Sequence, residues 1–350
     1  MRNLKEVLLR PGESTTMKQM SERIIFIGKN GDLSKYILAA LRDLGHTCLF
    51  IDQRGGISYR FALLRKGVHR IAALKKLREW EIKRLNSAIL KEASSFKPTL
   101  VLVWNGDTIA TETIQSLRSQ GITTANWFLD LMTHWEIIKK VAPVYDYFFT
   151  PDAEVISSLQ KIGVKSHKAS FAFKAAFERF PEGARQYPVS FVGSYDPKIW
   201  RKREELLRAL TDFNVHIWGP PIWKATPLAN NYHGGAAGEK MIEIYRKSKI
   251  VVDIPWDHIP ASAISIRPYE VTASGACLFF YDIRPEMSEL FNPDKEYVSF
   301  KNAQELREKV RYYLDHPHEL HAVAYAGYQR FMRDHTYHKR LADMLSIIRS

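Results

Sequence analysis

Short apolar runs alternate with helical patterns through most of the first half of the chain. The apolar runs end in glycine or polar residues and span residues 23–28, 47–52, 99–104, 123–130 and 145–152. Segments between these runs, such as 33–45 and 111–121, place apolar residues at helical spacing. Strands that alternate with helices are typical of a parallel sheet with helices on both faces. The first half therefore predicts a doubly wound α/β domain.

The same pattern starts again after an irregular stretch. Residues 180–188 contain proline and glycine without periodicity, as linkers do. Apolar runs then return, separated by helical patterns, at residues 189–194, 215–219, 249–254, 276–282 and 296–300. A chain of 350 residues is long enough for two domains. We expect a polar tail over residues 1–22, a Rossmann-like domain over 23–184 and a second one over 185–334.

Composition narrows the class of protein. The formal net charge of +13 favours anionic partners, such as nucleotides, nucleic acid or an acidic membrane surface. Cys48 and Cys277 both lie in apolar runs, which indicates buried free thiols and a reducing compartment. No apolar run approaches the roughly 20 residues that a membrane-spanning helix needs. Residues 1–22 lack the apolar core of a signal peptide, so we expect a cytoplasmic protein.

Much of the positive charge lies between Arg54 and Lys91. This stretch contains 11 Lys or Arg residues against two acidic residues, Glu79 and Glu81. Its apolar residues recur at helical spacing, which predicts an amphipathic helix, or two helices broken near Gly67. The basic side is either an ordinary solvated face or a docking surface for an anionic acceptor or a membrane.

Residues 264–282, with the sequence ISIRPYEVTASGACLFFYD, place charged side chains directly before a buried strand. The segment ACLFFYD has the pattern of a buried parallel strand, and PYEVTASG has that of a short helix. A hydroxyl, a cation and an anion gather where this helix begins, in Ser265, Arg267 and Glu270. Ser265, Arg267 and exposed helix amides suit a phosphate group. Alternatively, Arg267 and Glu270 form a simple ion pair across one helical turn.

Two other strand ends carry glycines before a helix. Ligands of doubly wound sheets bind outside the carboxyl ends of the strands. Gly28 and Gly31 flank the turn after the first strand, and without a third glycine they indicate a tight turn rather than a dinucleotide fingerprint. Gly193 and Ser194 follow the first strand of the second domain and predict a second set of exposed amides.

Several stretches of the second half, taken together, resemble the spore-maturation-type glycosyltransferases, which have the two-domain GT-B fold. In order they are FVGSYDPKIWRKREELLRAL, VHIWGPPIW, YRKSKIVVDI, SIRPYEVTASGACLFFYD, ELFNPDKEYVSFKNAQELREKVRYYLDHP and HTYHKR. The resemblance covers residues 189–340, and the first half matches more loosely through FKPTLVLVWNGD and WFLD. It implies two Rossmann-like domains that face each other across a cleft, with residues 335–350 as a helix that crosses back to the first domain.

The resemblance also implies a function and several residue roles. The second domain would hold a UDP- or GDP-linked sugar as co-substrate, with no permanently bound cofactor, and the first domain would hold the acceptor. Arg203 matches an arginine of the family and would meet the pyrophosphate together with Arg267. Glu270 would bind the ribose hydroxyls. An aromatic or apolar wall for the base would come from Trp218, Gly219 and Trp223. Trp218 fits an ordinary core position equally well.

The catalytic side is less defined by the sequence. Many retaining GT-B enzymes carry two glutamates eight positions apart, but Ser262 stands eight residues before Glu270, so retention or inversion stays open. Asp130, which ends the fourth strand, and His134 are the candidates for acceptor-side chemistry, with Asp130 as general base. The alternative for Asp130 is an acid that caps the next helix. No DxD triplet and no cluster of ligands is present, so we expect no metal site, with arginines and helix dipoles meeting the diphosphate charge.

Two further functions remain open at this stage. A GT-B protein that has lost transfer would still bind a nucleotide sugar. A glycosyltransferase acting on nucleic acid is motivated by the basic segment 54–91, although the chain carries no nucleic-acid-binding signature. The acceptor of a transferase would otherwise be a glycan, a lipid, a protein or a small molecule, and peripheral contact with a membrane stays open.

Overall fold

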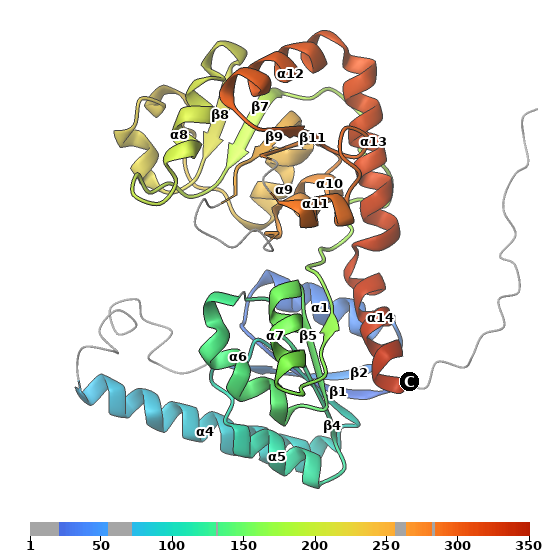
Figure 1. Ribbon diagram of the computed structural model, residues 1–350. Coiled ribbons are helices and arrows are strands. Elements are labelled where there is room, and N and C mark those ends of the chain that lie inside the picture. The colour runs from blue at the N-terminus through green and yellow to red at the C-terminus, as the bar shows by residue number, and fades with distance from the viewer. Residues whose placement is uncertain (1–20, 55–71, 131, 256–263, 282–283) are drawn as a thin grey trace, which may run out of the picture.

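Two parallel sheets, each covered by helices on both faces, form the two ends of the molecule (Figure 1). The computed structural model describes residues 21–54, 72–130, 132–255, 264–281 and 284–350. The predicted fold class, an α/β protein with two Rossmann-like domains, is confirmed.

The first sheet has the strand order β2-β1-β3-β4-β5-β6, with all neighbouring strands parallel. Its strands are β1 (Arg23–Gly28), β2 (Thr47–Asp52), β3 (Leu100–Trp104), β4 (Thr123–Trp127), β5 (Tyr147–Thr150) and β6 (His167–Lys168). In β1, Ile24 and Phe26 pack on one face of the sheet, and Ile25 and Ile27 pack on the other. The run is apolar throughout because both faces of the strand are buried.

Helices cover both faces of the first sheet. The helix α1 (Asp32–Asp43) packs on the face of Ile24 and Phe26, and α4 (Ala72–Phe96) and α5 (Thr111–Ser119) pack on the opposite face. The helices α6 (Trp135–Val141) and α7 (Ala153–Lys161) pack against the chain after β4 and against β5. Short 3-10 turns precede and follow α6, at Met132–His134 and Ala142–Val144.

The second sheet has the strand order β11-β10-β9-β7-β8 and is also parallel. Its strands are β7 (Tyr187–Val192), β8 (Val215–Trp218), β9 (Ser248–Asp253), β10 (Cys277–Tyr281) and β11 (Val298–Phe300). Its helices are α8 (Arg201–Arg208), α9 (Gly238–Arg246), α10 (Arg267–Ala273), α11 (Pro285–Leu290), α12 (Ala303–Asp315) and α13 (Pro317–Asp334). Short 3-10 turns lie at Thr211–Phe213, Pro221–Ala225 and Ala229–Asn231. Strand β9 lies in the centre of this sheet, so its carboxyl end is held on both sides.

The last helix, α14 (Tyr337–Arg349), returns to the first domain, as predicted for residues 335–350 (Figure 1). Its apolar residues Tyr337, Leu341, Met344 and Leu345 lie on one helical face and are buried against α1 and the first sheet. His338 lies 2.9 Å from Asp43 at the end of α1. Burial of this apolar face, more than the exposed polar contact, attaches α14 to the first domain.

Two chain segments run between the domains, and they are hydrogen-bonded to each other. The amide of Phe173, in the segment that leads from the first domain to the second, donates to the carbonyl of His335 at 3.1 Å. The amide of Tyr337 donates to the carbonyl of Phe173 at 3.0 Å. The outgoing and the returning chain therefore form one connection with a short parallel bridge.

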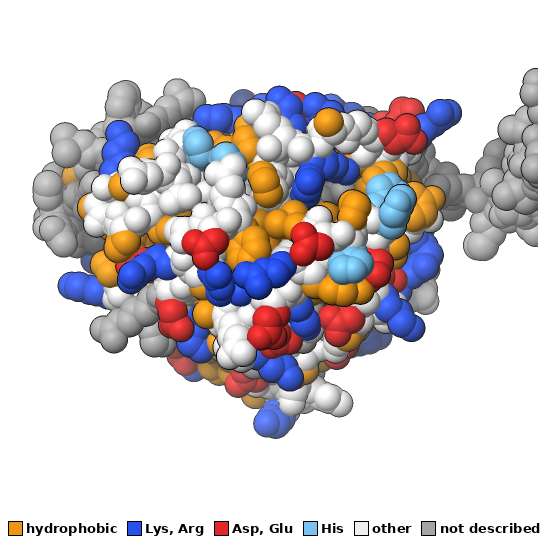
Figure 2. All heavy atoms as spheres, turned by 90° about the horizontal axis from the view of Figure 1, so that it is seen from above, with side chains coloured by type: hydrophobic (Ala, Val, Ile, Leu, Met, Phe, Trp, Pro, Cys, Tyr) orange, Lys and Arg blue, Asp and Glu red, His pale blue; other side chains and the backbone are white. Residues whose placement is uncertain are grey.

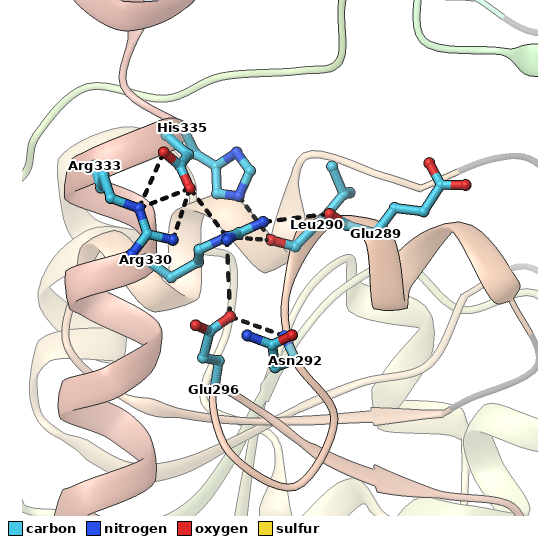
Figure 3. A network of polar contacts seen from close by, with 8 residues as sticks. Glu289, Leu290, Asn292, Glu296, Arg330, Arg333 and His335 are labelled. Atoms are coloured by element: carbon cyan, nitrogen blue, oxygen red, sulfur yellow. Dashed lines mark hydrogen bonds and ion pairs between the residues drawn. The ribbon is translucent and has the colours of Figure 1, made fainter.

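A polar network surrounds the end of α13 beside this connection, and Figure 3 shows Arg330 at its centre. Arg330 donates to the carbonyl of Leu290 at 2.9 Å and lies 3.2 Å from the carboxylate of Asp334. Glu296 lies 3.9 Å from Arg330 on another side. His335 follows Asp334 directly, so the same network fixes the residue at which the chain turns toward the first domain.

His335 is buried as a neutral ring at this turn. Its Nε2 lies 2.9 Å from the carbonyl oxygen of Leu290, and because a carbonyl only accepts, this nitrogen carries the proton. The ring packs edge-on against Tyr269 and lies 4.7 Å from the ring of Phe291. Burial lowers the pKa of His335 to about 4.

The two cysteines are free thiols, as predicted. Cys277 is fully buried in β10, whereas Cys48 is half-buried because β2 is an edge strand. Within the described residues, no helix combines the length and the hydropathy that crossing a bilayer would require.

The buried His335 predicts a loss of stability in mild acid. Below pH 6.5 the unfolded chain binds a proton at this ring, while the folded chain binds it only near pH 4. The free energy of unfolding should therefore fall by about 1.4 kcal/mol for each pH unit across this window. Urea unfolding at pH 7.5, 6.5, 5.5 and 4.5 measures the slope. In His335→Gln, which cannot titrate, the slope should be shallower by that amount, while the two curves run parallel above pH 7. Equal slopes from pH 6.5 to 4.5 would contradict the burial of a neutral ring.

Candidate functional site

A cavity of about 390 Å³ lies between the two domains, at the carboxyl ends of their strands. Five predicted site residues line it: Asp130 and His134 from the first domain, and Arg203, Ser265 and Arg267 from the second. Five polar or aromatic residues that the sequence did not single out also line it, namely Thr133, Phe171, Trp200, Asp253 and Arg284. The cavity therefore unites residues that are far apart in the chain, with cations from one domain facing an acid and a histidine from the other.

Asn105 orients Asp130 on the first-domain side. The Nδ2 of Asn105 donates to Oδ2 of Asp130 at 2.7 Å, and its Oδ1 accepts from the amide of Leu129 at 2.8 Å. Asn105 is buried and has a φ of 60°, in the left-handed region that only a few non-glycine residues adopt. The two side-chain bonds of Asn105 therefore fix the carboxylate of Asp130 relative to the chain that follows β4.

Among the described residues, Asp130 does not cap the helix that follows it. The amide of Met132, the first residue of the 3-10 turn before α6, donates to Asp152 at 3.0 Å. Asp130 instead points its carboxylate to Asn105 and lines the cavity. His134 is exposed at the cavity wall, with Nδ1 3.2 Å from the hydroxyl of Thr133.

Arg203 is anchored to backbone carbonyls at two strand ends of the second domain. Its Nε donates to the carbonyl of Ile254 at 2.8 Å, and its Nη1 donates to the carbonyl of Ser194 at 2.7 Å. Its guanidinium also lies over the ring of Trp200, 4.6 Å from the centroid. These two hydrogen bonds and the stacking on Trp200 fix the orientation of the Arg203 guanidinium before any ligand binds.

Arg267 is held in the same way at the start of α10. It donates to the carbonyl of Val192 and to the hydroxyl of Tyr245, and its Nε lies 3.5 Å from Oε2 of Glu270. Burial acts to lower the pKa of Arg267, but Tyr245, Glu270 and Asp253 together outweigh it and raise the pKa. Arg267 therefore stays charged where it lines the cavity.

The ion pair of Arg267 with Glu270, the alternative interpretation of this helix start, is present in the structure. Glu270 is buried, and burial raises its pKa against the opposing effect of Arg267. Its Oε2 has no hydrogen-bond partner among the described residues. The carboxylate thus pairs in charge with Arg267 and keeps an acceptor position unfilled. Ser265 caps the turn, because its hydroxyl accepts from the amide of Arg267 at 3.3 Å.

The structure places Trp223 and Trp218 in the core, not at the cavity. Trp223 is fully buried, its ring stacks on Tyr195 at 4.6 Å, and its Nε1 donates to the carbonyl of Gly193 at 3.0 Å. Trp218 is also buried and packs edge-on against Tyr187. We therefore assign both rings to the packing of the second domain and correct the prediction that Trp223 walls a base.

The glycines after β7 and β8 are required by close packing. A Cβ on Gly219 would lie 2.2 Å from the carbonyl oxygen of Gly193, so the two loops can touch only without a side chain there. The amide of Gly193 donates to the carbonyl of Trp218 at 2.9 Å, which contradicts the prediction of a free phosphate-binding amide. Ser194 is exposed, and its carbonyl accepts from Arg203 at 2.7 Å. Phosphate binding by its amide stays a prediction.

Gly28 and Gly31 do not line the cavity either. Gly28 is buried, and a Cβ there would lie 3.0 Å from the hydroxyl of Ser34 in α1. Gly31 stands exposed before α1, whose second turn meets the second domain: Tyr36 donates to Glu239 of α9 at 2.9 Å. Lys174 also pairs with Glu239. This turn therefore serves a contact between the domains.

The described residues contain a second cavity of about 390 Å³, at the opposite end of the second sheet, where β9 and β10 begin. Figure 2 looks onto this end, where hydrophobic side chains lie beside Lys and Arg. Phe180, Leu320 and Ala324 make its lining largely apolar. Its arginine, Arg185, is already bonded to the carbonyls of Pro181, Gly275 and Arg246. The cavity between the domains is therefore the better candidate for a charged ligand.

The core position of Trp223 can be tested through stability. Removing a fully buried indole leaves a cavity, so Trp223→Leu should lower the free energy of unfolding by roughly 2–4 kcal/mol. Trp80 on α4 is 53% exposed, so Trp80→Leu is a matched control that should change it by less than about 0.5 kcal/mol. Chemical denaturation of both variants beside the native protein decides the matter. A Trp223→Leu protein as stable as the control would contradict the core assignment.

Comparison with known proteins agrees with this architecture. Residues 201–346 match a family model described as glycosyl transferase-like. A sucrose-phosphate synthase from Thermosynechococcus elongatus has a similar structure, with a TM-score of 0.68 and 12% identity over 94% of this chain and 98% of that one. A glycosyltransferase from Rickettsia africae gives 0.64 and 13% over 94% and 98%. Anabaena HepE in complex with UDP-glucose gives 0.59 and 11% over 93% and 99%. No curated protein matches the sequence significantly. The chain therefore has the GT-B fold and carries a glycosyl transferase-like second half.

Proposed function

We propose that the protein is a glycosyltransferase that moves a sugar from a nucleoside-diphosphate sugar to an acceptor hydroxyl. The observation that carries the proposal is the cavity between the domains, where anchored arginines of the second domain face an oriented carboxylate of the first. The family match over residues 201–346 and a similar structure that holds UDP-glucose support transfer from such a donor. The resemblance of the second half to spore-maturation-type enzymes supports the same reaction class.

The diphosphate would lie against Arg203 and Arg267. As the bond between the sugar and the diphosphate breaks, negative charge grows on the leaving oxygen. Guanidinium groups that backbone carbonyls already orient stabilise this charge with little reorganisation. Among the described residues, no group of three or more His, Cys, Asp or Glu side chains is arranged to hold a metal ion. We therefore propose that the arginines act without a divalent metal.

Asp130 would act on the acceptor. The oxygen of the acceptor hydroxyl forms the new bond to the anomeric carbon, and its proton passes to the Asp130 carboxylate. The bond from Asn105 leaves the rest of that carboxylate facing the cavity. Glu270, with an unfilled acceptor position, is the candidate for the ribose hydroxyls.

A nucleotide-release assay tests transfer directly. UDP-glucose and GDP-glucose are supplied with a panel of candidate acceptors, in EDTA and in Mg²⁺ or Mn²⁺, and free nucleotide and product are quantified. Asp130→Asn should lower the transfer rate by about 10²–10⁴-fold, the range of a lost general base, and leave UDP affinity unchanged. Asp43→Asn, an exposed acid on α1, is the control and should alter neither quantity.

Three outcomes would count against parts of the proposal. Binding without release of nucleotide would favour a nucleotide-sugar-binding protein. Conversion of the donor to an epimer would indicate an epimerase. Activity abolished by EDTA and restored by a divalent ion would refute metal independence.

The acceptor side has a second feature, the basic helix α4. Lys75, Lys76, Lys83 and Arg84 are exposed on it, and the guanidinium of Arg84 lies over the exposed ring of Trp80, 5.4 Å from the centroid. An exposed indole among cations suits the surface of an anionic membrane. Residues 55–71 of the predicted basic segment lie outside the described residues. We propose that α4 docks on an anionic lipid surface that presents the acceptor.

Vesicle binding tests this docking. Native protein should bind phosphatidylglycerol vesicles, bind phosphatidylcholine vesicles weakly, and lose binding as salt rises. A variant with Gln at Lys75, Lys76, Lys83 and Arg84 should bind at least tenfold more weakly with a flatter salt dependence. A control variant with the same change of charge carries Gln at Lys161, Lys198, Lys224 and Lys295. Equal binding by the two variants would refute a role for α4.

A further inference from the structure

Asp253 is a buried carboxylate with an unfilled acceptor position in the wall of the cavity. It ends β9, the central strand of the second sheet, and is only 6% exposed. Its Oδ2 is buried and has no hydrogen-bond partner among the described residues. It lines the cavity together with Arg203, Arg267 and Ser265. The end of β9 therefore places in the cavity wall a carboxylate of which one oxygen has no hydrogen-bond partner among the described residues.

Neighbouring arginines oppose the effect of burial on the carboxyl group of Asp253. Burial raises the pKa of Asp253, and Arg267, Arg203 and Arg284 act against that rise. The hydrogen bonds of Arg203 run to the carbonyls of Ile254 and Ser194, and those of Arg267 run to Val192 and Tyr245. The arginines thus act on Asp253 through their charge, and among the described residues its Oδ2 has no hydrogen-bond donor.

A buried carboxylate oxygen without a donor is costly, and native proteins rarely retain one unless a ligand or water fills the position. Asp130, across the cavity, shows the contrast, because Asn105 already donates to it at 2.7 Å. The unfilled acceptor at Asp253 is thus a feature of the second-domain wall, where the donor would bind.

The chemistry of a carboxylate selects which part of a nucleotide sugar it can contact. An ionised carboxylate only accepts hydrogen bonds, so phosphate oxygens, which are anionic acceptors, are repelled by it. The arginines beside it attract those same oxygens. Hydroxyl groups are the neutral donors that a sugar carries in number. We propose that Asp253 accepts hydrogen bonds from hydroxyls of the transferred sugar and so contributes to sugar selection. This inference rests on the proposed function, because it presumes a nucleotide-sugar donor.

The test compares nucleotides with and without their sugar. Calorimetry gives the affinities of UDP and UDP-glucose, and of GDP and GDP-glucose, for the native protein, Asp253→Asn and Asp253→Ser. Asp315→Asn, an exposed acid at the end of α12, is the control. Asn keeps the size of the side chain but loses the charge, and Ser provides a smaller second variant should the first fail to fold.

The two variants should lose at least about tenfold in affinity for the sugar nucleotide, the scale of a hydrogen bond to a charged group. Affinity for the bare nucleotide should stay within about threefold, because the arginines that meet the phosphates remain. A parallel loss for both ligands would show that Asp253 acts through the arginines and would overturn the inference, as would unchanged affinity for both. Native protein that binds none of the four ligands would overturn the proposed function itself, together with the inference.

Discussion

The bridge between the two crossing segments is the contact on which the site depends. Phe173 exchanges backbone hydrogen bonds with His335 and Tyr337, so the outgoing and returning chains cannot turn independently. Because strands in each sheet are parallel, all their carboxyl ends lie on one edge, and the bridge sets those two edges opposite each other. The ion network around Arg330 then fixes the end of α13 beside the bridge. A change in this connection would move every residue of one cavity wall relative to the other.

Charge in the cavity is arranged before any ligand is present. Arg203 and Arg267 are bonded to carbonyls at the ends of β7 and β9, which are among the most rigid points of the sheet. Two buried carboxylates, Asp253 and Glu270, lie close enough to affect the pKa of Arg267. Within the part of the chain that the structure describes, each has one oxygen without a hydrogen-bond partner. Such a site is less stable than an apolar core would be, because buried charges are only partly compensated. Proteins accept this loss where a ligand completes the hydrogen bonds.

The sequence predicted the sheets well because a buried parallel strand leaves an apolar run that ends in a polar residue. The same rule found Asp130 and Arg267 at strand and helix ends. It failed for Gly193, because a glycine needed for close packing and one needed for phosphate binding look alike in sequence. It also failed for Trp223, whose indole is bonded to the carbonyl of Gly193 in the core. Asp253 was passed over as the last residue of a buried strand, and only the burial of its free oxygen distinguishes it. Asn105 carried a weak signal, an Asn-Gly pair directly after a strand, but its bond to Asp130 spans 25 residues.

Proteins of different activity share this fold, so the fold places a ligand between the domains without naming the reaction. The arginines and the carboxylates of the cavity recognise different parts of a ligand. Arginines bonded to backbone carbonyls can bind any diphosphate, because a guanidinium is attracted by the negative charge and donates hydrogen bonds to two oxygens. Carboxylates with unfilled oxygens accept hydrogen bonds from hydroxyls, whose number and direction differ from sugar to sugar. In the reaction that we propose, selection among donors depends on residues such as Asp253 more than on the arginines, and selection of the acceptor depends on the first-domain wall around Asp130.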